Sequence, residues 1–106
     1  MITYQKQRIT ETIAEVKAAI AADEFYYPDS PGDPLNCFQV VVDVSKPLRG
    51  KTKFSSYEMG ASADSVLKGI IREMILTESD DGGTISPSSL EQVRILKYTP
   101  VATGSQ

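Results

Sequence analysis

The sequence of 106 residues contains no histidine, no tryptophan and one cysteine, Cys37. The lack of histidine excludes imidazole general bases, Ser-His-Asp triads and histidine-ligated metals. A single cysteine supports neither an intrachain disulfide nor a metal site with several thiolates, so we interpret Cys37 as a small buried hydrophobic residue. Because the sequence offers no catalytic set, we expect a protein that is not an enzyme and has no cofactor and no metal.

Long apolar runs and an excess of positive charge are also missing. No apolar stretch approaches the ~20 residues that span a bilayer, and the first ten residues lack the apolar centre of a secretory signal. The net charge of −3 and the isoelectric point near 4.8 do not favour binding to nucleic acid or to an anionic membrane. These absences predict a cytoplasmic protein without a membrane partner, for which nucleic acid is an unlikely ligand.

The remaining composition is that of a folded protein. Apolar residues make up 41% and charged residues 24% of the chain, both near the average for globular proteins. The length suits one compact unit, so we predict a single small domain over residues 1–106, with a frayed tail from about residue 100.

Two segments have the apolar periodicity of a helix. In the first, apolar residues recur every three or four positions from Ile9 to Ile20, which predicts a helix from about residue 4 to 23 with Thr3 as its N-cap. The second begins near Ser62 and continues to about residue 76, with Asp64 favourably placed in its first turn. Both helices are amphipathic, so each should bury one face.

Three segments are typical of strands. Residues 36–46 alternate from Phe38 to Val44, and residues 51–59 form the return strand of a hairpin. Residues 92–98 form the last strand, with Val93, Ile95 and Leu96 as its inward candidates, after a short helical turn that Ser86 caps. In the second strand strict alternation separates Phe54 from Tyr57, and a bulge at Ser55 and Ser56 would bring them to one side.

The order α-β-β-α-β predicts an α+β fold in which two amphipathic helices pack on one face of a small, mostly antiparallel sheet. Three strands leave two unpaired edges. Either a further short strand lies within residues 24–36, or an edge is used to form a homodimer.

One stretch, RGKTKFSSYEMGASADS at residues 49–65, supports a binding site. If the hairpin brings its basic side chains near the start of the second helix, cations and free amides would converge on an anion such as a nucleotide-like ligand. The predicted ligand-binding residues are Arg49, Lys51, Lys53, Tyr57 and Ser62. In the simpler interpretation the lysines protect a strand edge and Ser62 only caps a helix.

A protein-interaction or inhibitory module, of the kind carried as accessory proteins by mobile elements, is the alternative. Its contact surface would be either an open sheet edge or the aromatic residues Phe25, Tyr26 and Tyr27 in a proline-rich loop. The acidic stretches DSPGDP and ESDDGG lack the ligand spacing of a calcium loop, so we interpret them as solvated loops.

Overall fold

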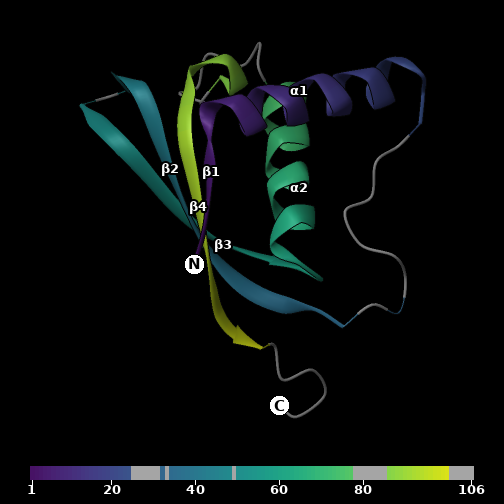
Figure 1. The fold of residues 1–106 in the computed structure, drawn as a ribbon, viewed down its shortest axis with the longest axis vertical. Coiled ribbons are helices and arrows are strands. Elements are labelled where there is room, and N and C mark those ends of the chain that lie inside the picture. Colours follow the sequence, from purple (N-terminus) through teal and green to yellow (C-terminus); the bar gives the residue numbers. More distant parts are fainter. Residues whose placement is uncertain (25–31, 33, 49, 78–85, 101–106) are drawn as a thin grey trace.

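The computed structural model describes residues 1–24, 32, 34–48, 50–77 and 86–100 (Figure 1). The elements, in chain order, are β1 (Ile2–Gln5), α1 (Lys6–Ala21), β2 (Asn36–Leu48), β3 (Lys51–Gly60), α2 (Ala63–Leu76), the short 3-10 helix η1 (Pro87–Ser89) and β4 (Leu90–Pro100). The predicted α+β class and the predicted order of helices and long strands are confirmed. The chain differs from the prediction by one additional strand at its start.

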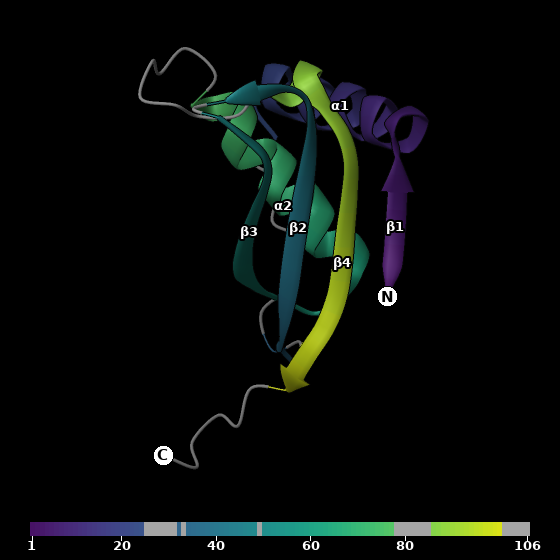
Figure 2. The same ribbon diagram turned by 90° about the vertical axis from the view of Figure 1, so that its left-hand side faces the viewer.

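The sheet has the strand order β1-β4-β2-β3, and every neighbouring pair is antiparallel. Strand β4 therefore lies between β1 and β2, and the connection between those two strands contains α1. In the same way β2 lies between β3 and β4, whose connection contains α2. Both helices lie on the same face of the sheet, and Figure 2 shows the sheet from its other, uncovered face. The two edge strands are the four-residue β1 and the ten-residue β3.

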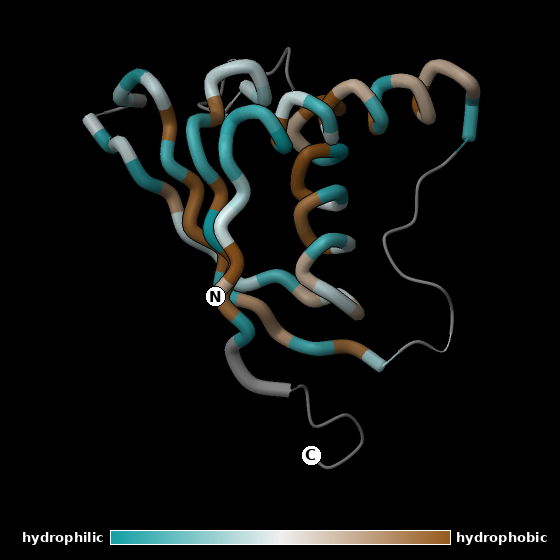
Figure 3. Tube along the Cα trace, viewed as in Figure 1, coloured by the Kyte–Doolittle hydropathy of each residue, from teal (hydrophilic) through white to brown (hydrophobic). Residues whose placement is uncertain are grey.

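The hydrophobic core fills the space between the sheet and the two helices. Alternate residues of β2, from Phe38 to Val44, face the helices and are almost completely buried, as are Val93 and Ile95 of β4. The helices contribute the apolar faces that the sequence predicts, and Figure 3 shows hydrophobic positions of α2 turned toward the sheet. Each fully buried aliphatic side chain stabilises the fold by about 1.5–3 kcal/mol, so this layer contact is the main source of stability.

The start of the first helix was wrongly predicted. Ile2 and Tyr4 alternate, and their strand pairs with β4 opposite Ile95 and Val93, so Tyr4 packs against the core. Helix α1 begins only at Lys6, after an extended Gln5 that makes no side-chain capping bond. Tertiary pairing with a core strand outweighs local helix propensity here. The fourth strand thus precedes α1; residues 25–31 and 33 of the alternative segment lie outside the described residues.

The predicted bulge at Ser55 and Ser56 is also wrong. The pairing of β2 with β3 is continuous from Asn36–Gly60 to Asp43–Lys53, and the register shifts only beyond Asp43, near the hairpin. Phe54 therefore faces the helices, whereas Tyr57 and Met59 lie on the uncovered face. The bulge was expected in order to bury Tyr57 and Met59 with Phe54. These two side chains instead remain 58% and 54% exposed, so the strand needs no bulge.

Helix α2 begins as predicted. The Ser62 hydroxyl accepts a hydrogen bond from the Ser65 amide at 3.2 Å, and the Ser62 amide donates one to the Ser65 hydroxyl at 3.1 Å. This reciprocal capping box uses two amides that would otherwise lack partners. In the first turn, where Asp64 was predicted to be favourably placed, its carboxylate lies 3.4 Å from the Lys68 ammonium.

The last strand follows the prediction with one correction. Val93 and Ile95 face the core, but Leu96 lies opposite Gln39 on the uncovered face and is only half-buried. Cys37, which was predicted to be buried, lies opposite Met59 on the same uncovered face. It is therefore only half-buried. None of the described helices is both long and apolar enough to cross a membrane.

Candidate functional site

The structure does not bring the predicted anion-binding residues together. Lys51 and Lys53 lie at the hairpin end of β3, and Ser62 follows its opposite end. An extended strand of ten residues covers roughly 30 Å, and both views show the hairpin tip well separated from the start of α2 (Figures 1 and 2). The expected junction required a bent strand, and β3 has no bulge that would supply the bend. Arg49 lies outside the described residues.

Lys53 instead lines a shallow polar hollow on the uncovered face. The other charged residues of this hollow come from separate elements: Lys6, Asp43, Glu91 and Arg94. The Arg94 guanidinium donates a hydrogen bond to the Asp43 carboxylate at 3.3 Å, and the Lys6 ammonium lies 3.8 Å from the Glu91 carboxylate. Two of the three cations thus already face a carboxylate, so the hollow offers an anion little uncompensated charge.

Tyr57, the fourth described candidate, belongs to a different part of the uncovered face. It lies opposite Gln39 of β2, whose other neighbour across the sheet is Leu96. One step further along the sheet Met59 lies opposite Cys37. The Ser62 end of the uncovered face is therefore largely apolar, whereas the hairpin end is charged.

A second concave feature is a groove between the edge strand β3 and helix α2. It consists of two adjoining hollows of about 450 and 310 Å³. They share Glu58 of β3 and Ile70, Glu73 and Thr77 of α2. The groove lies where α2 leaves the inner side of β3 partly uncovered, so that Phe54 and Glu58 on that side are only half-buried.

The floor of this groove is apolar. Val66 and Ile70 line one hollow, and Phe54 and Met74 line the other together with Ile70. Gly69 also borders the groove, and its lack of a side chain keeps the α2 wall low at this point. Such a floor, open along one side to the edge of the sheet, suits the side chains of another chain segment.

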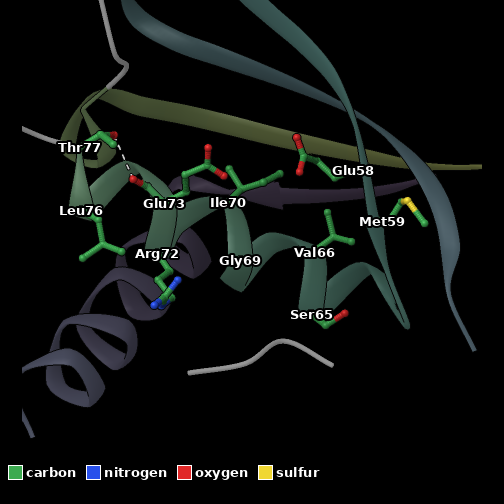
Figure 4. Close-up of a pocket in the computed structure, with 10 residues that line it drawn as sticks. All are labelled: Glu58, Met59, Ser65, Val66, Gly69, Ile70, Arg72, Glu73, Leu76 and Thr77. Carbon is green, nitrogen blue, oxygen red and sulfur yellow. Dashed lines mark hydrogen bonds between the residues drawn. The ribbon is translucent and has the colours of Figure 1, made fainter. Parts of the chain in front are cut away.

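Two carboxylates border the apolar floor of the groove. Glu58 lies opposite Phe38 in the sheet and therefore faces the helix layer, where it is half-buried. Glu73 projects from α2, and Figure 4 shows the two carboxylates on the same side of the helix with Ile70 between them. Among the described residues, no lysine or arginine forms an ion pair with either carboxylate.

The neighbouring cation does not neutralise this pair. Arg72 also lines the larger hollow of the groove, but its side chain extends from the other side of α2, as Figure 4 shows, and it lines a further hollow with Asp23 and Glu24 near the end of α1. The groove consequently has a net negative charge beside an apolar floor.

The described residues hold no group of three or more cysteine, aspartate or glutamate side chains that could bind a metal ion. Among the described residues, Tyr4 and Arg8 have shifted pKa values, and both lie away from the groove, near the start of α1. The hydrogen bond to Asp64 raises the pKa of Arg8, and burial raises the pKa of Tyr4.

Sequence reasoning did not identify this groove, although each carboxylate interrupts a pattern. Glu58 occupies a position of β3 that faces the core, and Glu73 lies one turn beyond Ile70 on the α2 surface. Only the packing of α2 against the sheet shows that these positions border one groove. Comparison of the chain with protein-family models, with curated proteins and with solved structures gave no match.

Proposed function

We propose that the chain is a non-enzymatic protein-interaction module that binds an extended segment of a partner protein as an additional strand beside β3. The observation that supports this proposal is the free edge of β3, a regular strand of ten residues without proline. No described residue pairs with β3 on the side away from β2. A long unpaired edge presents a row of amides and carbonyls that another strand can satisfy.

The charge distribution along β3 indicates which part of the edge is available. Lys51 and Lys53 lie at the hairpin end, where lysines commonly prevent unwanted strand pairing. The part from Phe54 to Gly60 carries no lysine or arginine. The groove, which the exposed Met59 also borders, lies on one face of this part, and the exposed Tyr57 lies on the other. A bound segment of about six residues would therefore find side-chain contacts on both faces of the sheet, as in other strand-addition complexes.

The alternative contact surface predicted from the sequence, Phe25 to Tyr27, lies outside the described residues and adds no geometry to this proposal. Binding of a nucleotide-like anion is the second candidate function, and the feature that favours it is Lys53 in the polar hollow. It requires an anion that competes with Asp43 for Arg94, because those two side chains are already hydrogen-bonded. Calorimetry with ATP and with cyclic nucleotides tests this candidate.

Selection from a randomised heptapeptide library against the whole chain, followed by amide hydrogen exchange, tests strand addition. A selected peptide should slow the exchange of amides in β3 and leave those of the other edge strand, β1, unchanged. The variant Ser56→Lys places a lysine in the open part of the edge and should weaken binding, whereas Gln7→Lys on the exposed side of α1 should not. Selected peptides that protect other elements, or no selected peptide at all, would contradict the proposal.

A further inference from the structure

We infer that the segment bound beside β3 carries a lysine or arginine between Glu58 and Glu73, with apolar residues immediately before and after it. This inference rests on the proposed strand addition and specifies the chemistry of the partner. It follows from the charge of the groove, from the alternation of side chains in a strand, and from the register that a second copy of this chain could adopt.

The position of Glu58 gives the first argument. The residues opposite successive helix-facing positions of β3 are Phe38, Val40 and Val42, all nearly inaccessible to solvent. Glu58 thus has an apolar neighbour on β2 and, within the described residues, no cationic partner. A partly desolvated carboxylate gains much more from a nearby cation than an exposed one does, because water screens it less.

The position of Glu73 gives the second argument. Glu58 and Glu73 both line both hollows and flank Ile70, so the two like charges border one space. A cation between them would interact favourably with each and would remove the uncompensated charge on both. A long lysine or arginine stem would also cover Ile70, since such side chains bury their methylene groups against apolar surface.

The alternation of a strand determines what lies next to the cation. A residue directly opposite Glu58 in an added antiparallel strand would face the groove, because opposed side chains share one face of a sheet. The residues before and after it would face the other way and would lie opposite Tyr57 and Met59. These two side chains are 58% and 54% exposed, so apolar partner residues there would remove apolar surface from water.

A second copy of the chain does not meet these requirements. A homodimer formed through this edge would pair β3 with β3, and an antiparallel pair places residues of the same face opposite each other. Lys53 lies on the uncovered face opposite Asp43, and Lys51 lies two residues before it, whereas Glu58 faces the helices. No antiparallel β3–β3 register therefore places either lysine opposite Glu58, and the occupant that fits the groove is a different protein segment.

The test compares peptide selections against the wild-type chain and against Glu58→Gln, Glu73→Gln and the double variant. Wild-type selections should enrich lysine or arginine at one position flanked by apolar residues. Each single variant should bind such a peptide about 3–10-fold more weakly in fluorescence anisotropy, consistent with loss of one partly buried charge contact. Glu91→Gln, in the polar hollow away from the groove, is the control and should leave the affinity unchanged. Thermal unfolding checks that all variants fold.

The outcomes distinguish the inference from the proposed function. Peptides that protect β3 but show no preference for a cation would overturn the inference and leave strand addition intact. If the wild-type chain and the Gln variants bind a lysine peptide equally well, the inference is also overturned and strand addition remains intact. Absence of any peptide that protects β3 would overturn the proposed function and the inference with it. A dimer in light scattering whose β3 amides are protected without peptide would overturn the inference, since a second copy would then occupy the edge.

Discussion

The Arg8 guanidinium donates a hydrogen bond to the Asp64 carboxylate at 3.2 Å, and this contact joins the first turn of α1 to the first turn of α2. Asp64 also forms an ion pair with Lys68 within α2, and Arg8 forms ion pairs with Glu11 and Glu15 of α1. The network links the N-terminal ends of both helices. It thus contributes to the position of α2, which forms one wall of the groove.

A double-mutant cycle of Arg8→Gln and Asp64→Asn should give a coupling energy of at most about 1 kcal/mol. The coupling is limited because the two side chains are 36% and 46% exposed and solvent screens their attraction. Urea denaturation of the four proteins measures it. A coupling energy several times larger would show that the pair is effectively desolvated and would contradict this estimate.

Truncation of the core side of α2 should destabilise the protein much more than truncation of its exposed side. Leu67 is completely buried, and Leu67→Ala should cost about 2–5 kcal/mol because it creates a cavity. Leu76 is largely exposed, and Leu76→Ala should cost less than about 0.5 kcal/mol. Chemical denaturation checks both values, and similar losses for the two variants would mean that α2 is packed differently.

The capping box of α2 makes a separate prediction about stability. Ser62→Ala removes the hydroxyl that accepts from the Ser65 amide and should destabilise the protein by about 1 kcal/mol. Ser62→Asp retains an acceptor and should restore most of this loss. Neither variant should change peptide affinity, because Ser62 lines neither hollow of the groove. A clear change in nucleotide binding in Ser62→Ala would instead support the anion site predicted from the sequence.

Several of these features could be predicted from the sequence because they depend on neighbours in the chain. The alternation from Phe38 to Val44 identified β2, and the serine before an apolar helical stripe identified the cap of α2. Strand β1 was missed because four residues are too few to show a period, and because only pairing with β4 explains why Ile2 and Tyr4 are extended.

The groove could not be predicted because it depends on contacts between distant parts of the chain. Glu58 and Glu73 belong to different elements, and the packing of α2 on the sheet determines that they border one space. The expected convergence of Lys53 and Ser62 is absent for a related reason. Residues near one another in sequence, Lys53 and Ser62, are separated by the length of an extended strand.

Tyr4 should make the stability of the protein depend on alkaline pH. Burial, with a smaller effect of the nearby Asp64 carboxylate, raises the pKa of Tyr4 above 10.0, so the folded state favours the neutral phenol. The stabilisation is therefore complete below the pKa of the unfolded chain and is lost as the pH rises through the raised pKa of the folded chain. From about pH 9 to pH 11 the wild-type protein should lose more stability than Tyr4→Phe. Urea denaturation at several pH values measures this difference, and parallel curves for the two proteins would contradict it.

Asp43→Asn tests whether the hollow on the uncovered face can bind anions. Asp43 and Arg94 form a hydrogen-bonded ion pair and are only 19% and 28% exposed, and the Arg94 Nε has no partner among the described residues. Removing the carboxylate should therefore destabilise the protein by about 1–3 kcal/mol, because the guanidinium loses its charged acceptor.

The same change leaves Arg94 and Lys53 facing a hollow with one negative charge fewer. Sulfate or ATP should consequently raise the melting temperature of Asp43→Asn more than that of the wild-type protein, through preferential binding to the folded state. Asp43→Asn/Lys53→Ala is the matched control, in which the additional effect should be reduced. If the wild-type protein already binds ATP with saturation and Asp43→Asn does not bind it more tightly, Asp43 does not block the hollow. The nucleotide-like ligand would then be the better proposal for this face of the sheet.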